Sequence, residues 1–126
     1  MPRIRSQPEP IADGAIVTKA AMRAAARLGL PNRSVARILG LSEATVSRMG
    51  TGTYQLKTDD KAFELALMFL RLFRSLDALS GGDEQTSRAW LRNENVALGA
   101  VPVALIESLS GLINVVGYLD ARRARV

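Results

Sequence analysis

Residues 34–49 read SVARILGLSEATVSRM and contain the signals of two short helices joined by a tight turn. The first helix is indicated by an apolar stripe of Val35, Ile38 and Leu39. Gly40 permits the left-handed backbone of a sharp turn, and Ser42 is suited to cap the second helix. The stretch therefore predicts a helix-turn-helix.

The second helix of this motif turns small and polar side chains outward, because Val46 and Met49 point toward the interior. Such side chains can approach base edges in the major groove of DNA. The candidate base contacts are Glu43, Thr45 and Ser47, and the candidate phosphate contacts are Arg33, Arg37 and Arg48. Two alternatives stay open: the motif can be a packing unit without a DNA partner, and Arg48 can form a surface salt bridge to Glu43 or Asp60.

Basic residues are concentrated around the motif. The whole chain has a net charge of +5, whereas residues 16–57 contain seven Lys or Arg against Glu43 alone, a net charge of +6. A solvated surface without a ligand would scatter this charge, and a phosphate-binding face concentrates it. The distribution favours nucleic acid as a partner but indicates no base sequence.

The composition of the 126-residue chain narrows its chemistry. Cys and His are absent, which excludes thiol and imidazole catalysis, disulfides and Cys/His zinc sites. We find no nucleophile with its base, no metal cluster and no phosphate loop, so we expect a binding protein with no catalytic residue, metal, cofactor or small-molecule substrate. The first ten residues lack the apolar run of a signal peptide or anchor, which predicts a cytoplasmic protein.

The N-terminal residues 1–15 are rich in proline and without apolar periodicity, which predicts a mobile arm. Its Arg3 and Arg5 either reach a DNA groove or make no contact. From Ile16 the spacing is helical until Gly29. We expect Asn32 to cap a helix over 33–39 and the recognition helix to span about 43–49.

Residues 59–79 are expected to form the longest and most apolar helix, opened by the hydroxyl and carboxylates of 58–60. Four charged residues interrupt its apolar run and exclude a membrane span; they are Glu64, Arg71, Arg74 and Asp77. A helix that is apolar on several faces must be covered on several sides. It is either a core helix packed by both halves of the chain or one that also forms a homodimer seam.

A second unit begins at the break over 80–83, where Asp83 is a fresh N-cap. The pattern predicts a helix over 84–91, a turn at 93–95, a helix from Pro102 to about 109, and a last helix over about 112–124. Alternating strand patterns are absent. We predict an all-α protein, with an N-terminal helix-turn-helix bundle joined through a long central helix to a small C-terminal helical domain.

The second unit contains a set of residues at characteristic spacings, namely Trp90-Leu91, Asn95, Leu98-Gly99, Pro102, Leu105, Ser110-Gly111, Val115 or Val116, and Tyr118-Leu119. This set resembles the toxin-binding domain shared by the Xre, MbcA and ParS antitoxins, which in that family follows an Xre-like helix-turn-helix. The resemblance covers residues 16–126. Most of the motif has fold-making tasks, such as apolar anchoring by Trp90 and close helix approach at Gly111, so it identifies a scaffold more than a contact surface.

The resemblance implies a protein that neutralises a RES-type toxin, which depletes NAD, and that represses its own operon. It implies an arm over 1–15, an Xre-like DNA-binding and dimerisation domain over 16–79, and a toxin-binding domain over 80–126. The expected partners are a RES-domain toxin, operator DNA and a second copy of the chain, with no membrane. The alternative is a free-standing helix-turn-helix regulator or a partition-type adaptor whose C-terminal unit dimerises.

Relatives often extend the last helix further, whereas this sequence ends Ala-Arg-Arg-Ala-Arg-Val over 121–126. The candidate toxin contacts are Tyr118, Arg122, Arg123, Arg125 and Val126. Either this terminus enters or rims the NAD pocket of the toxin, or its arginines are solvated charges at a helix end.

Overall fold

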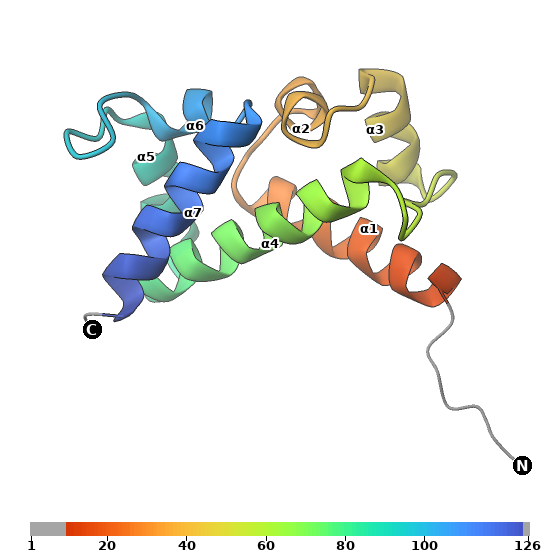
Figure 1. The fold of residues 1–126 in the computed structure, drawn as a ribbon, viewed down its shortest axis with the longest axis horizontal. Helices are drawn as coiled ribbons and strands as arrows, with labels where there is room; N and C mark the ends of the chain where they lie inside the picture. The colour runs from red at the N-terminus through yellow and green to blue at the C-terminus, as the bar shows by residue number, and fades with distance from the viewer. Residues whose placement is uncertain (1–9, 125–126) are drawn as a thin grey trace, which may run out of the picture.

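A computed structural model describes residues 10–124, and this part of the chain is built of seven helices without a strand (Figure 1). The helices are α1 (Pro10–Arg27), α2 (Asn32–Leu39), α3 (Glu43–Thr51), α4 (Lys61–Leu79), α5 (Glu84–Arg92), α6 (Pro102–Leu105) and α7 (Leu109–Ala124). The prediction of an all-α protein is confirmed. None of these helices combines the length and the apolar character that crossing a membrane requires.

The first helix starts earlier than the sequence pattern predicted. α1 begins at Pro10, so residues 10–15 are helical and the prediction that they belong to a mobile arm is wrong. Proline suits the first turn of a helix, because a backbone N–H at that position would have no partner within the helix. Asp13 also lies in the first turn, where a negative charge is favourable. Gly14 is buried against the carbonyl of Leu56, and a Cβ atom at this position would collide with that carbonyl. Residues 1–9, with Arg3 and Arg5, lie outside the described residues.

The helix-turn-helix forms as its local signals predicted. Gly40 has a φ of 71° and ends α2, and the Ser42 hydroxyl accepts a hydrogen bond from the Thr45 backbone N–H at 3.1 Å. α3 continues to Thr51 because Gly52, with a φ of 83°, ends it in place of Gly50. Asn32 is the first residue of α2 rather than its cap, since Pro31 takes the cap position in extended conformation.

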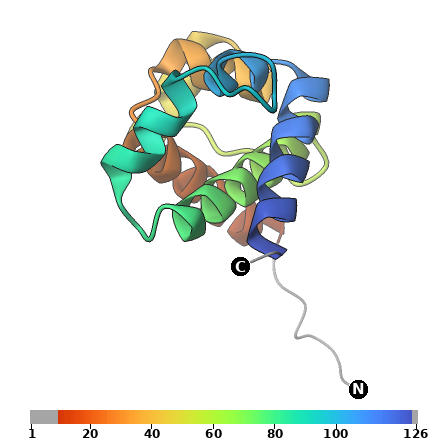
Figure 2. The same ribbon diagram turned by 90° about the vertical axis from the view of Figure 1, so that its left-hand side faces the viewer.

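The central helix α4 lies between the two halves of the molecule and packs against both α1 and α7 (Figures 1 and 2). Its buried face recurs at helical spacing along Ala62, Ala66, Phe69, Leu72 and Leu76. The predicted core role is therefore confirmed. The helix begins at Lys61 and not at residue 59, with Asp60 at the cap position but without a side-chain cap bond.

The C-terminal half is arranged around a short α6. Asp83 caps α5 as predicted, and the Thr86 hydroxyl, 2.6 Å from its carboxylate, lowers the pKa of Asp83 together with backbone N–H groups. The predicted helix from Pro102 to about 109 ends at Leu105, and α7 begins at Leu109. Gly111 is not a break; it lies inside α7, where a Cβ atom would collide with the Leu105 carbonyl.

The two halves are joined by arginines of α5 that cap the C-terminal end of α1. Arg88 Nε donates to the Arg27 carbonyl at 2.8 Å, and Arg92 Nη2 donates to the Gly29 carbonyl at 2.7 Å. Helix C-terminal carbonyls lack partners within the helix, and cations are favourable there. Arg27 also pairs with Glu84 at 3.0 Å. These contacts orient the helix-turn-helix relative to the C-terminal half.

Candidate functional sites

The outward face of α3 contains the side chains predicted to approach base edges. Glu43, Ser47 and Arg48 are exposed, and Thr45 is half-buried, while Val46 and Met49 pack inside. The Thr45 hydroxyl accepts from the Ser42 hydroxyl at 2.9 Å and from Arg48 Nη2 at 3.2 Å. Arg48 therefore lies back along the helix, and it pairs with neither Glu43 nor Asp60, the alternative that the sequence left open.

The two α2 arginines are both exposed, and they are one helical turn apart. Arg33 lies in the first turn, and Arg37 lies in the last turn. Arg37 Nη1 is 3.3 Å from Glu107 Oε1, a carboxylate contributed by the segment between α6 and α7. Figure 1 shows α2 and α3 next to each other along the upper edge of the molecule. The structure thus gathers the six candidate DNA contacts on two neighbouring helices, with one of them already in an ion pair.

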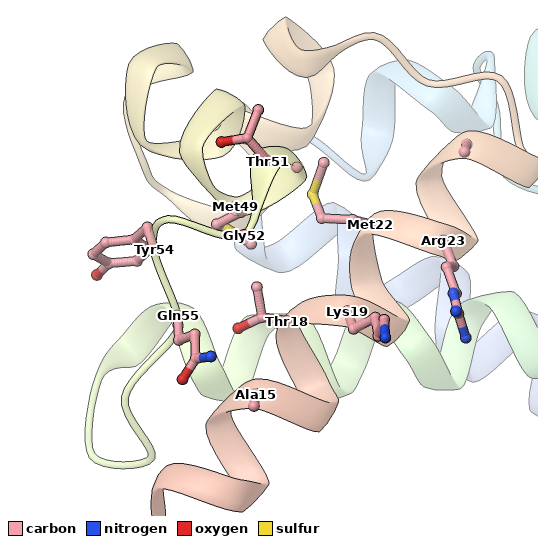
Figure 3. Close-up of a pocket in the computed structure, with 12 residues that line it drawn as sticks. Ala15, Thr18, Lys19, Met22, Arg23, Met49, Thr51, Gly52, Tyr54 and Gln55 are labelled. Carbon is pink, nitrogen blue, oxygen red and sulfur yellow. The ribbon is translucent and has the colours of Figure 1, made fainter.

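A groove of about 540 Å³ lies between α1 and the end of α3, and the sequence did not predict it (Figure 3). Lys19 and Arg23 line it from α1, and Thr51, Gly52 and Gln55 line it from the other side. Met22 and Met49 supply apolar surface. The only sign of this groove in the sequence was that Lys19 and Arg23 are four residues apart on the first helix, which places them on one face. This spacing does not reveal that a loop lies opposite them.

The candidate toxin contacts of α7 are held by neighbouring side chains. The Tyr118 ring stacks on Trp90 with centroids 6.3 Å apart, and Arg122 Nη1 donates to the Tyr118 hydroxyl at 2.8 Å. Arg123 Nη1 donates to the Ser75 hydroxyl of α4 at 3.1 Å. Tyr118 and Arg122 thus form one cluster with Trp90, whereas Arg123 contacts Ser75 on α4. Arg125 and Val126 lie outside the described residues.

Apolar side chains are exposed on the C-terminal half at positions that the sequence did not single out. Leu109 is 55% exposed and Ile113 is 48% exposed, and they are one turn apart at the start of α7. Val96, in the segment before α6, is 95% exposed. Exposed apolar side chains that gather on one helix face are typical of protein contact surfaces. Among the described residues, no group of His, Cys, Asp or Glu is arranged to hold a metal ion.

This arrangement defines a two-part helical protein, with a helix-turn-helix unit and a C-terminal helical unit that share α4. The sequence model of the antitoxin Xre-like helix-turn-helix domain matches residues 8–71, and that of the antitoxin Xre/MbcA/ParS C-terminal toxin-binding domain matches residues 75–125. The chain therefore belongs to the Xre family of antitoxins. The two matches meet inside α4. No curated protein matches the chain.

Proposed function

We propose that this chain neutralises a RES-domain, NAD-depleting toxin by binding and blocking its active site, and that it represses its own operon as a cytoplasmic homodimer. The two family matches, a DNA-binding unit followed by a toxin-binding unit, support an antitoxin with DNA binding. Both families are generally non-enzymatic, so the activity proposed here is binding. The observation that carries the proposal is the toxin-binding match over residues 75–125, which coincides with the exposed apolar start of α7.

For the DNA surface, α3 enters the major groove with Glu43 and Ser47 toward base edges, and Arg33, Arg37 and Arg48 contact phosphates. Thr45 remains a base-contact candidate, although its hydroxyl already accepts from Ser42 and Arg48. In a dimer, two recognition helices one helical turn apart read a near-palindromic operator. We expect that replacement of Arg48 by Glu abolishes the operator shift and leaves toxin inhibition intact. Loss of both activities would show that the fold had been broken.

For the dimer, the solvent side of α4 is the proposed seam. Leu67 is 45% exposed, between the half-buried Phe63 and Leu70. Glu64 lies three residues before Leu67 and Arg71 lies four residues after it. Two copies of α4 that cross antiparallel at Leu67 bring each Glu64 toward the Arg71 of the other copy, whose guanidinium is also paired with Asp120 of its own chain. A two-fold interface requires this kind of self-complementarity.

For the toxin, the start of α7 supplies apolar contact area, and Tyr118 with the terminal arginines supplies polar contacts. Deletion of residues 122–126 tests whether the terminus closes the NAD pocket. Because the deletion also removes the bond from Arg123 to Ser75, the single substitution Arg122→Ala accompanies it and leaves that bond in place. Undiminished inhibition by both variants at equimolar antitoxin rejects the terminal plug.

The proposal as a whole is tested by co-expressing the chain with the protein encoded next to it, which the proposal expects to be a RES-domain toxin, and purifying them by a tag on one partner. We expect a stable complex and restored cellular NAD. A chain that shifts DNA but forms no such complex is instead a free-standing regulator or a partition-type adaptor, in which the C-terminal half serves for dimerisation.

A further inference from the structure

We propose that the groove between α1 and the end of α3 binds the sugar-phosphate backbone of the DNA duplex that α3 reads, with Lys19 and Arg23 as the phosphate contacts. The DNA-binding surface then extends beyond the helix-turn-helix onto α1. This inference rests on the proposed DNA binding of the chain.

The charge of the groove selects an anion. Lys19 and Arg23 are the charged members of its lining, and no acidic side chain lines it. Within residues 10–124 neither cation has an ion-pair partner, whereas Arg27 and Arg37 are both paired. An exposed cation without a carboxylate beside it is available to a phosphate and releases a counterion when the phosphate binds.

The dimensions of the groove favour a nucleotide backbone over a single small anion. Lys19 and Arg23 are four residues apart, about 6 Å along α1, and phosphates follow one another every ~3.4 Å of duplex length on one strand. The groove volume of about 540 Å³ leaves room for more than one phosphate. Apolar surface from Met22 and Met49 suits a sugar face, and Gln55 adds an amide donor from the opposite side.

The C-terminal end of α3 borders the groove, and its negative pole would oppose an anion. The loop after α3 removes most of this opposition. The Arg48 carbonyl accepts from the backbone N–H of Thr53 at 2.9 Å and of Tyr54 at 3.2 Å. The Arg48 carbonyl at this end of α3 is therefore not left without a partner, and within residues 10–124 the two cations on α1 are the only full charges that line the groove.

The position of the groove connects it to the proposed recognition surface. Thr51 lines the groove, and it lies one turn after Arg48 on the same helix. A duplex whose major groove holds α3 has a backbone strand on each side of that helix. The strand on the α1 side passes over Lys19 and Arg23.

The test compares two double substitutions of equal charge, in the full chain alone and bound to its toxin. Lys19→Gln with Arg23→Gln removes the groove cations, and Lys61→Gln with Arg74→Gln removes two exposed cations of α4. Fluorescence anisotropy measures binding to a duplex from the region upstream of the coding sequence and to a random-sequence duplex over a range of salt. The groove variant binds both duplexes roughly tenfold more weakly at about 0.1 M salt, and the slope of log K against log salt falls by about one to two.

Four results overturn the inference. Equal effects of the two double substitutions show that only net charge matters. If the groove variant no longer binds inorganic phosphate or a free mononucleotide but its duplex affinity is unchanged, the groove is a site for a small anion. If Arg48→Glu weakens duplex binding and the groove variant does not, the DNA function stands without the groove; if the wild-type chain binds no duplex, both proposals fail.

Discussion

Arg37 of the helix-turn-helix and Glu107 of the C-terminal half form an ion pair, with Nη1 and Oε1 3.3 Å apart. Arg37 is one of the proposed phosphate contacts, so a carboxylate from the toxin-binding half occupies a guanidinium that DNA would otherwise use. Glu107 lies two residues before α7, whose exposed first turns are the proposed toxin contact. The proposed DNA-binding and toxin-binding surfaces are therefore adjacent at this pair.

Replacement of Glu107 by Gln should strengthen duplex binding about threefold, because it releases Arg37 and removes a negative charge near the phosphates. The pair is exposed on the Arg37 side, so the free energy of unfolding should change by less than about 0.5 kcal/mol. Anisotropy titration and urea unfolding measure the two quantities. Glu94→Gln, which removes an exposed carboxylate of the same half, is the control, and an equal gain from it would contradict the role of the pair.

Replacement of Leu67 by Glu should dissociate the proposed homodimer, because it places two carboxylates at the centre of an apolar contact. Sedimentation velocity measures the change. Ile16→Glu is the matched control, since Ile16 is also exposed, at 65%, but lies on α1. If both variants stay dimeric, the seam is not at Leu67; if the wild-type chain is a monomer at all concentrations, there is no dimer to explain.

Replacement of Gly111 by Ala should destabilise the fold by about 1–3 kcal/mol, because the new Cβ atom collides with the backbone of Leu105. Gly117 lies in the same helix with open space around its Cβ position. Gly117→Ala should therefore stabilise by about 0.5–1 kcal/mol through helix propensity. Urea denaturation followed by circular dichroism distinguishes the two, and effects of the same sign would contradict the close approach at Gly111.

Thr18 connects α1 to the segment between α3 and α4. Its buried hydroxyl donates to the Gly14 carbonyl at 2.6 Å and accepts from the Leu56 N–H at 2.8 Å. Thr18→Val should cost about 1–3 kcal/mol in the free energy of unfolding, since it leaves the Leu56 N–H without a partner. Thr18→Ser retains the hydroxyl and should lower the free energy of unfolding by less. Equal losses from the two substitutions in a urea titration would assign the effect to the methyl group instead.

Features specified by neighbouring residues could be predicted from the sequence. Gly40 and Ser42 act on a turn of a few residues, and the structure shows both in the predicted roles. The predicted start of α1 and the predicted boundary between α6 and α7 were wrong. Pro10 and Gly111 are each compatible with two situations, a break between helices or a position within a helix. Local spacing does not distinguish these situations.

Contacts between distant segments could not be predicted in the same way. Arg37 and Glu107 are 70 residues apart in the chain, and Arg88 and the Arg27 carbonyl are 61 apart. The groove likewise needs α1 and the loop after α3 to be opposite each other, which only the packed fold provides. The motif around Trp90 and Gly99 was sufficient to identify the C-terminal scaffold, but it gave no information on Leu109 or Ile113, whose exposure depends on what surrounds them.

The most direct test of the account is the growth of cells that express the proposed RES-domain toxin partner together with one of two forms of this chain, wild type or Arg48→Glu. Both chains are expressed from a promoter that the protein does not control. Both forms should restore growth and NAD to the same extent, because the proposal places toxin neutralisation in the C-terminal half and DNA binding in α3. Continued growth arrest with the wild-type chain, at expression levels equal to those of the toxin, would contradict the account.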